Sequence, residues 1–425
     1  MVPRSKPRPA PPAARAPAAL HLVVGVLLTI GMVLRIMAFP VGARTPDEQV
    51  YTFYAQGLSH GGFGALPELM QGYVGRPQLH VLPPPIRLGH YGLVAGLMSV
   101  TGNASAEAGA LLSTLSSCLI LVLVAWLGFA YFGPWAALLA LGFAVPSPVD
   151  LALARRAWGD ELLALVTLAA LVAFLEHGDG SRRTVWALAC LFLAAYSVLV
   201  KETGILILAM ATLGLTVAAW RASGPRAAVA MLGAGVIAGL LAIGTLVLAG
   251  GGASLVRSAL SVASTAARSN PYVLRYQTGG IVYYARGLVL LEPVPAVLGA
   301  ASALLVAGLW LRGRIDVARP REQRALSALA ALVLGLGTAA VLYPQKNLRF
   351  LSPLYASLDL LAAALIVRAT RAAAPRLSPR VLRITASAGL LVLVLSGVVE
   401  HGRFVEYFVR RGIPDLVTPR LVEGR

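Results

Sequence analysis

The stretch RTPDEQVYTFY, residues 44–54, places two adjacent carboxylates, Asp47 and Glu48, just after the first long apolar run of the chain. Acidic residues are scarce here, since Asp and Glu together number 18 among 425 residues. The preceding run, residues 18–39, is long enough to cross a bilayer, for which a helix needs about 20 apolar residues. Two charges at the end of a membrane helix are costly unless they are paired or functional, so we expect the rest of the chain to supply their partners.

The composition is that of a membrane protein. Hydrophobic residues make up 58% of the chain and the mean hydropathy is +0.76, which is too much apolar surface for one water-soluble core. Apolar runs of about 20 residues recur between short basic or Gly/Pro-rich stretches, which predicts an all-α polytopic bundle. The net charge of +18 is interpreted as membrane topology, because Lys and Arg collect on the cytoplasmic side, and nucleic-acid binding is therefore not implied.

We expect about 11 membrane-spanning helices. The expected spans are residues 18–39, 108–131, 135–153, 160–176, 185–200, 204–220, 227–249, 291–311, 325–343, 351–367 and 382–399. The segment 91–100 offers about ten apolar residues where a span needs about 17, so we interpret it as interfacial or re-entrant. The long outer loop 40–107 is rich in aromatic residues, which predicts short helices at the headgroup level.

The chain divides into three parts. A Pro-rich basic tail, residues 1–17, is expected to be disordered and cytoplasmic, followed by a transmembrane domain over residues 18–400 and a short extracytoplasmic tail over residues 401–425. With the basic tail inside, the first span delivers Asp47 and Glu48 to the extracytoplasmic face. The short arginine-rich loops then fall inside, as the positive-inside rule requires.

With this topology, clusters of charged residues far apart in sequence share the outer face. They are Asp47 with Glu48, Arg155 and Arg156 with Asp160 and Glu161, Lys201 with Glu202, and Lys346 with Arg349. Desolvating one such group costs several kcal/mol, so these charges are expected to pair around a shared cavity or an anionic substrate.

The chemistry that suits such a ring is displacement of a phosphate-linked group by a hydroxyl. Asp47 would take the proton of the acceptor as general base, with Glu48 and Asp160 orienting the acceptor or raising the pKa of the base by like-charge proximity. Lys346 and Arg349 would grip the departing phosphate, because cations neutralise its charge and Arg offers a fork of donors.

The order of short motifs along the chain resembles the GT-C glycosyltransferases of the protein O-mannosyltransferase and aminoarabinose-transferase type. The motifs are Asp47-Glu48, Pro84-Pro85-Ile86, Arg156-Ala157-Trp158-Gly159-Asp160, Lys201-Glu202-Thr203-Gly204 and Arg349-Phe350-Leu351-Ser352-Pro353. Each motif alone is weakly specific, but their order and common sidedness make the set more specific. The chain differs from some relatives in that no large soluble domain follows its last expected helix, which leaves the choice of acceptor open.

The resemblance implies an inverting transferase that moves one sugar from a polyprenyl-phosphate carrier to an acceptor hydroxyl outside the cytoplasm. The richness in alanine and arginine is typical of a high-GC bacterium, so we expect the protein in a bacterial inner membrane. The resemblance assigns the base to Asp47, and the acceptor is a protein, a glycolipid or another glycan. The residues expected to bind substrate are Tyr51, Arg156, Lys201, Lys346 and Arg349. We expect no covalently bound cofactor and no metal site in the protein, while assistance by a divalent cation is left open.

Simpler interpretations exist for each motif. Asp47 and Glu48 suit the first turn of a helix capped by Thr45, and Lys201 suits an ion pair with its neighbour Glu202. At the level of function, the alternatives are a lipid or small-molecule transporter and a non-catalytic subunit of an envelope complex. The chain shows no internal repeat and its charges crowd one face, which favours the enzyme.

Overall fold

The computed structural model describes residues 18–39, 45–179, 182–314 and 321–423. Within these ranges the chain forms helices joined by short connections and no strand. The all-α architecture expected from the sequence is therefore confirmed. The predicted basic tail, residues 1–17, lies outside the described residues.

The first half of the fold runs to the tenth α-helix. Its α-helices are α1 (Ala18–Met37), α2 (Pro46–Gly61), α3 (Leu66–Gly75), α4 (Leu88–Thr101), α5 (Ala106–Leu127), α6 (Pro134–Ala144), α7 (Pro148–Ala154), α8 (Asp160–Asp179), α9 (Arg183–Val200) and α10 (Gly204–Ser223). The second half contains α11 (Pro225–Ala249), α12 (Ala253–Ser269), α13 (Pro271–Tyr276), α14 (Ile281–Leu291), α15 (Pro293–Leu311), α16 (Arg321–Leu342), the 3-10 turn η4 (Leu348–Leu351), α17 (Ser352–Ala373), α18 (Pro379–Phe404), the π-helical turn η6 (Val405–Arg410) and α19 (Thr418–Glu423).

Among the described residues, 10 helices are long and apolar enough to cross a membrane, or 11 if one bent pair is a single span. This agrees with the expected number, and the protein is an integral membrane protein. Helix α4 has 14 residues, which makes it about 21 Å long and too short to span. The described part of the loop 40–107, which the sequence predicts to lie outside, also contains α2 and α3, so the short helices expected there are present.

The expected span 135–153 is broken in the structure. Helices α6 and α7 meet at an angle of 66° across a short break that contains Pro146. Proline removes a backbone donor and disfavours helical geometry in the residue before it, so the helix ends here. Pro148 then occupies the first turn of α7, and the Ser147 side chain caps that helix by accepting from the amide of Asp150 at 3.1 Å.

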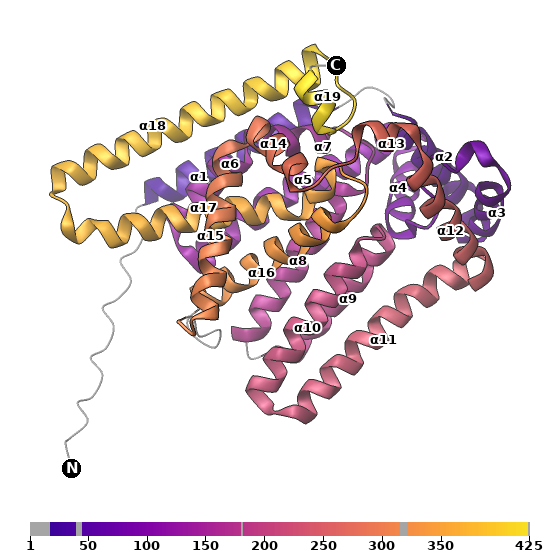
Figure 1. Ribbon diagram of the computed structural model, residues 1–425, viewed down its shortest axis with the longest axis horizontal. Coiled ribbons are helices and arrows are strands. Elements are labelled where there is room, and N and C mark those ends of the chain that lie inside the picture. Colours follow the sequence, from indigo (N-terminus) through magenta and orange to yellow (C-terminus); the bar gives the residue numbers. More distant parts are fainter. Residues whose placement is uncertain (1–17, 40–44, 180–181, 315–320, 424–425) are drawn as a thin grey trace.

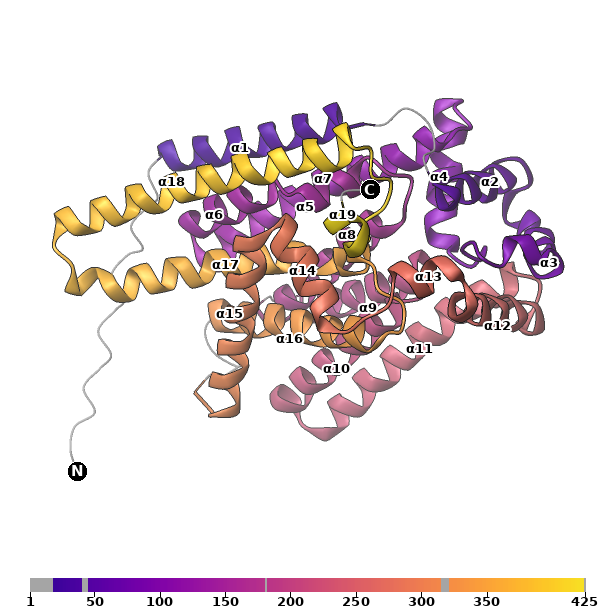
Figure 2. The ribbon, with the colours of Figure 1, turned by 45° about the horizontal axis from the view of Figure 1, so that its top comes forward.

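The interior of the bundle is built around α17. Its span is 83% buried and packs against α6, α8, α15 and α16. The spans of α11 and α18 are only 11% buried, and their exposed apolar side chains suit contact with lipid. Helices α1 and α18 both pack on α6 and α7, on the side of the bundle seen uppermost in Figure 2.

The short helices gather at one end of the molecule. Helix α2 packs against α4, α3 packs against α12, and Figure 1 shows this group beyond the ends of the long helices. The segment that carries the acidic pair, at the start of α2, thus lies where the connections between several long helices converge.

Candidate active site

The N-terminus of α2 fixes the acidic pair. Thr45 caps the helix in a capping box, in which the Glu48 side chain accepts from the Thr45 amide at 2.9 Å and the Thr45 hydroxyl accepts from the Glu48 amide. Pro46 follows the cap, where its missing N–H costs nothing. The helix-cap interpretation of this segment is therefore confirmed, and the cap sets the directions in which Asp47 and Glu48 point.

Glu48 is buried and fully engaged. One carboxylate oxygen pairs with Arg156 at 2.5 Å, and the other accepts from the Ala157 amide at 3.1 Å. The side chains of Glu48 and Arg156 are 2% and 6% exposed. Glu48 therefore joins the start of α2 to the loop between α7 and α8, and an acceptor could reach its oxygens only by breaking these bonds.

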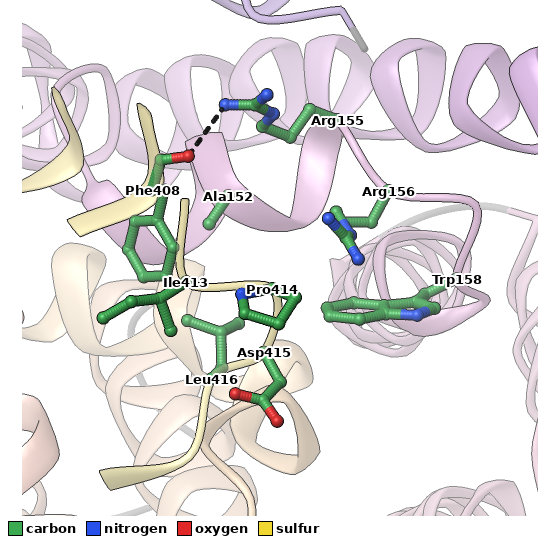
Figure 3. A pocket seen from close by; sticks show the side chains of 9 residues that line it. All are labelled: Ala152, Arg155, Arg156, Trp158, Phe408, Ile413, Pro414, Asp415 and Leu416. Carbon is green, nitrogen blue, oxygen red and sulfur yellow. Dashed lines mark hydrogen bonds between the residues drawn. The ribbon is translucent and has the colours of Figure 1, made fainter. Parts of the chain in front are cut away.

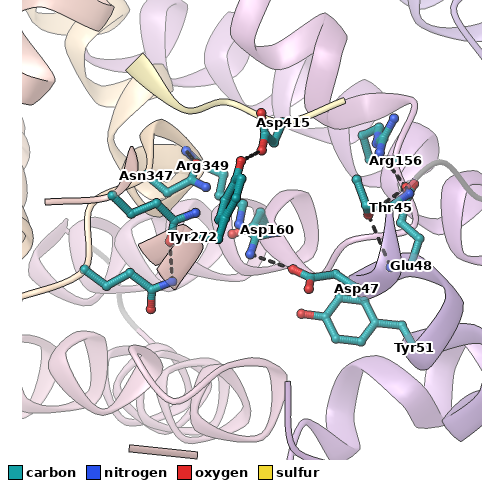
Figure 4. Close-up of polar contacts among 12 residues, drawn as sticks. Thr45, Asp47, Glu48, Tyr51, Arg156, Asp160, Tyr272, Asn347, Arg349 and Asp415 are labelled. Carbon is teal, nitrogen blue, oxygen red and sulfur yellow. Dashed lines mark hydrogen bonds and ion pairs between the residues drawn. The ribbon is translucent and has the colours of Figure 1, made fainter. Parts of the chain in front are cut away.

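Asp47 points the other way and pairs with Arg349 of η4, at 2.8 Å between the Asp47 carboxylate and the guanidinium. Here the side chains are 24% and 13% exposed, so this pair is open to an incoming molecule. Figure 4 shows the α2 carboxylates facing Arg349 and Arg156 from across the site. The Asn347 side chain caps η4 by accepting from the Arg349 amide at 3.1 Å, which holds the backbone of Arg349 in place.

Asp160 opens α8 and pairs with Lys201 at 2.5 Å, with side chains 4% and 6% exposed. Lys201 therefore does not pair with its neighbour Glu202, and the simpler interpretation of that dipeptide is wrong. Glu202 pairs instead with Arg87 at 3.0 Å. Burial lowers the pKa of Lys201, and the positive charges of Arg87 and Arg349 lower it further, against the opposing effect of Asp160.

Arg87 is a site residue that the sequence analysis missed. Its guanidinium also donates to the Tyr51 hydroxyl, so it connects the turn after α9 to α2. Burial alone would raise the pKa of Glu202, but the Arg87 guanidinium, a backbone hydrogen bond and the nearby Lys201 together hold that pKa below its usual value. The sequence did contain a clue to this role, because Arg87 directly follows the Pro84-Pro85-Ile86 motif.

Tyr51 lies behind the ion pairs. It is 3% exposed, and burial raises the pKa of its hydroxyl above the usual value. The structure thus places the ring in the packed layer under Asp47, one helical turn away, and its predicted role as a substrate-binding residue stays a prediction.

Two aromatic rings stand among the cations. The guanidiniums of Arg156 and Arg349 each lie 4.8 Å from the centre of the Trp158 ring, and the Lys201 ammonium lies 4.6 Å from that of Phe350. Cations over aromatic faces are attracted by the ring quadrupole, which helps to offset the cost of burying them. Trp158 belongs to a quoted motif, but sequence alone gave its ring no role.

Lys346 occupies a different place from the one expected. Its ammonium donates to backbone carbonyl oxygens at the end of α16, those of Ala340 at 3.2 Å, Val341 at 2.7 Å and Tyr343. A cation on the last carbonyls of a helix satisfies acceptors that have no partner within the helix. This geometry does not support the prediction that Lys346 grips a phosphate, because its donors are already used.

His90 lies behind Asp160. The ring is 1% exposed, and within the described structure its nitrogens have at most a weak hydrogen bond to the Ala157 backbone. Burial and the nearby Arg87 lower the pKa of His90 to about 3, so it is neutral at physiological pH. The backbone of Gly159 approaches this ring closely, since a Cβ there would lie 3.2 Å from His90 Cγ.

The C-terminal segment completes one wall of the site. Its backbone binds beside Arg349, where the Leu416 carbonyl accepts from the Leu348 amide at 3.0 Å, and Asp415 accepts from the Tyr272 hydroxyl. Figure 3 shows the small pocket between this segment and the loop carrying Arg156 and Trp158. The pocket holds about 10 Å³, room for a single water molecule.

Within the described ranges, no group of three or more His, Cys, Asp or Glu side chains is arranged to hold a metal ion. The absence of a metal site therefore stays a prediction, and assistance by a divalent cation stays open. The site is therefore a set of ion pairs between carboxylates and cations, contributed by α2, the α7–α8 loop, the α9–α10 turn and η4.

The sequence-predicted residues thus converge. Asp47, Glu48, Asp160, Lys201 and Arg349 take part in neighbouring ion pairs although up to 302 residues separate the partners. Arg156 joins them through Glu48, whereas Lys346 is turned toward a helix end. Their roles in chemistry stay predictions.

No protein-family model matches the chain, and no curated protein matches it in sequence. Solved structures do match. ArnT from Cupriavidus metallidurans bound to undecaprenyl phosphate superposes with a TM-score of 0.53 and 18% identity, over 93% of this chain and 71% of that one. The same ArnT in the apo state gives 0.51 and 18%, over 93% and 69%.

The archaeal oligosaccharyltransferase AglB from Archaeoglobus fulgidus, in complex with an inhibitory peptide and a dolichol-phosphate, gives a TM-score of 0.52 and 14% identity, over 90% of this chain and 55% of that one. At such identities the likeness shows the fold. The chain shares the fold of these structures, and the GT-C-like fold implied by the motif resemblance is confirmed.

Proposed function

We propose that this protein is an inverting glycosyltransferase that moves a sugar from a polyprenyl-phosphate donor to an acceptor hydroxyl, with Asp47 as general base and Arg349 on the donor phosphate. The observation that carries the proposal is the open Asp47–Arg349 pair, 2.8 Å long, at one end of the helix bundle beside the other ion pairs. ArnT with undecaprenyl phosphate and AglB with a dolichol-phosphate are structures of the same fold with lipid phosphates bound.

Exposure distinguishes the carboxylates. The Asp47 side chain is 24% exposed, against 2% for Glu48 and 4% for Asp160. A general base must come within hydrogen-bond reach of the proton that it takes. Asp47 meets this condition by releasing one partner, whereas Glu48 would have to break the cap of α2 as well.

Arg349 has a donor to spare. One terminal nitrogen donates to Asp47, but the buried Nε makes no hydrogen bond to any residue that the structure describes. A guanidinium binds phosphate through two parallel N–H groups, so once the Arg349 side chain turns to expose its Nε, a donor phosphate can bind while Asp47 is still paired. As the phosphate takes over the guanidinium, Asp47 is released at the moment when the acceptor needs a base.

The reaction follows from this exchange. The Asp47 carboxylate accepts the proton of the acceptor hydroxyl, and the acceptor oxygen forms a bond to the anomeric carbon of the sugar. The bond from that carbon to the phosphate oxygen breaks on the opposite face, which inverts the configuration. Polyprenyl phosphate leaves with its charge stabilised by Arg349, and Lys201 and Arg156 add positive potential nearby.

The setting is the extracytoplasmic face of a bacterial inner membrane. This sidedness is supported by the basic loops, which fall on the opposite side of the predicted topology. A polyprenyl donor would reach the site laterally from the outer leaflet. The acceptor, whether glycan, glycolipid or protein, would approach from the aqueous side.

The test supplies purified protein with a panel of polyprenyl-phosphate sugars and a mixture of envelope acceptors, and follows release of the lipid phosphate. Asp47→Asn should lower turnover by about 10²-fold to 10⁴-fold, the range for loss of a general base. A control is Glu176→Gln, which disrupts an ion pair with Arg321 elsewhere in the bundle; the Glu176 side chain is 18% exposed, close to the 24% of Asp47, although Arg321 is half exposed. Unchanged turnover in Asp47→Asn would remove the proposed base.

One observation favours a second candidate, a lipid transporter. The broken span formed by α6 and α7 is of a kind that transporters use near their binding sites. In sealed proteoliposomes a transporter would move a labelled polyprenyl-phosphate sugar between leaflets without releasing lipid phosphate. Release without movement between leaflets supports the transferase.

A further inference from the structure

We propose that Trp158 is a positioning residue that holds Arg349 by its ring face while the guanidinium exchanges Asp47 for the donor phosphate. The ligand in this proposal rests on the proposed function, but the contact between Trp158 and the arginines does not.

The geometry is that of one ring serving two cations. The guanidinium carbons of Arg156 and Arg349 both lie 4.8 Å from the centre of the Trp158 ring. Trp158 itself is 2% exposed, so these contacts lie in a poorly solvated place, where cation–π attraction is strongest. Figure 3 shows the Arg156 guanidinium beside the indole.

Each of the two cations also holds one member of the acidic pair. Arg156 binds Glu48 at 2.5 Å and Arg349 binds Asp47 at 2.8 Å. Two guanidiniums near one ring repel each other, and the two carboxylates offset this repulsion. Trp158 is thus the common neighbour of both pairs, and its position sets where both carboxylates of α2 meet their partners.

A ring contact suits an exchange of anions better than a second ion pair would. The aromatic ring attracts a guanidinium held over its face, which leaves the N–H groups at the guanidinium edge for anions. Arg349 uses one such group for Asp47, and its buried Nε has no partner in the part of the chain that the structure describes. The ring attracts the cation in the same way whether the anion is a carboxylate or a phosphate.

The indole N–H of Trp158 indicates that this side chain interacts through its ring face and not through a hydrogen bond. Buried tryptophans usually give their N–H a hydrogen-bond acceptor. Trp158 Nε1 is buried without one in the described structure. Since no polar partner fixes the indole, its position is set by packing and by the cations over its face.

The test varies the ring charge without changing the shape. Tryptophans carrying progressively more fluorine atoms are introduced at position 158 alone, which weakens the negative ring face stepwise. Ligand-free melting temperature and the dissociation constant of undecaprenyl phosphate are measured for each, together with Trp158→Phe and Trp158→Leu. The same series at Trp135, whose side chain is 58% exposed, is the control.

We expect both quantities to change stepwise with fluorination at position 158 and to stay constant at Trp135. Undecaprenyl phosphate should bind about tenfold more weakly to Trp158→Leu, with Trp158→Phe between the two because its ring is the weaker partner for a cation. In an Arg349→Gln background the stepwise change of melting temperature should shrink.

A flat series at position 158, with only the leucine variant affected, would overturn the proposal, because it would show that the ring acts by filling space. The ligand-free melting temperatures decide the contact itself. Failure of the unmodified protein to bind undecaprenyl phosphate would refute the donor assignment instead, so the two failures are distinguishable.

Discussion

Asp47 and Glu48 are neighbours in sequence, but removing their charges is predicted to have different effects: loss of the Glu48 charge should lower stability, and loss of the Asp47 charge should lower activity. Glu48→Gln keeps the shape, and its amide oxygen can keep the capping bonds, but its NH2 then faces the Ala157 N–H and the ion pair with the buried Arg156 is lost. Removing one member of a buried pair costs about 3–5 kcal/mol, and the retained cap places this case near 3. Asp47→Asn disrupts a partly exposed pair, for which the cost is about 1 kcal/mol or less.

The assay is equilibrium unfolding in mixed micelles titrated with a denaturing detergent, which gives the free energy of unfolding for each variant, alongside release of lipid phosphate. We expect Glu48→Gln to be strongly destabilised, with residual turnover in the molecules that remain folded. Asp47→Asn should be nearly as stable as the parent and almost inactive. A stable, inactive Glu48→Gln with an active Asp47→Asn would reverse the two roles and refute the reasoning from exposure.

Three further predictions follow from the other charged groups. Lys346→Met should lower the melting temperature, since it removes a cation from the end of α16, and leave the dissociation constant of undecaprenyl phosphate unchanged; a large loss of binding would restore Lys346 to the donor site. Asp160→Asn should destabilise the protein by about 3–5 kcal/mol because it leaves Lys201 buried and unpaired, and the double variant with Lys201→Met should recover much of the free energy of unfolding. Arg87→Gln should lower the melting temperature at neutral pH, and the difference from the parent should shrink below about pH 4. The reason is that the pKa of Glu202 is lower in the folded protein than in the unfolded chain, where it is about 4.3. The ionised Glu202 therefore stabilises the fold above the unfolded pKa, and this stabilisation is lost as the pH falls through the folded pKa. A difference that persisted unchanged at pH 3 would contradict this account of the Arg87–Glu202 pair.

The sequence predicted the convergence of the site because topology constrains it strongly. Apolar runs of spanning length fix the number of membrane crossings between any two residues. An even number of crossings separates Asp47, Asp160 and Arg349, which places them at the same end of the bundle. This count of crossings also depended on interpreting residues 91–100 as too short to span, and α4, with 14 residues, is as short as expected.

Pairing could not be predicted in the same way. Which cation meets which carboxylate depends on the direction of each side chain, and the cap at Thr45 decides this for Glu48 through bonds that no spacing rule reveals. Lys346 shows the same limit. It lies beside Arg349 in sequence, yet the preceding helix end offers it carbonyls within reach, and it turns toward them.

The aromatic contribution was missed because tryptophan in an apolar chain is expected to lie at the membrane interface or in the core. Trp158 becomes informative only when two guanidiniums are seen beside it. The break between α6 and α7 had a visible signal in Pro146 and Pro148, but an apolar run of spanning length outweighed it in the sequence interpretation.

The central claim is that Asp47 and the donor phosphate compete for Arg349. Its most direct test is the dissociation constant of undecaprenyl phosphate for the parent, Asp47→Asn and Arg349→Gln. Loss of a competing anion should make Asp47→Asn bind about fivefold more tightly, the equivalent of about 1 kcal/mol, while Arg349→Gln binds more weakly. Weaker or unchanged binding by Asp47→Asn would show that the carboxylate and the phosphate do not share this arginine.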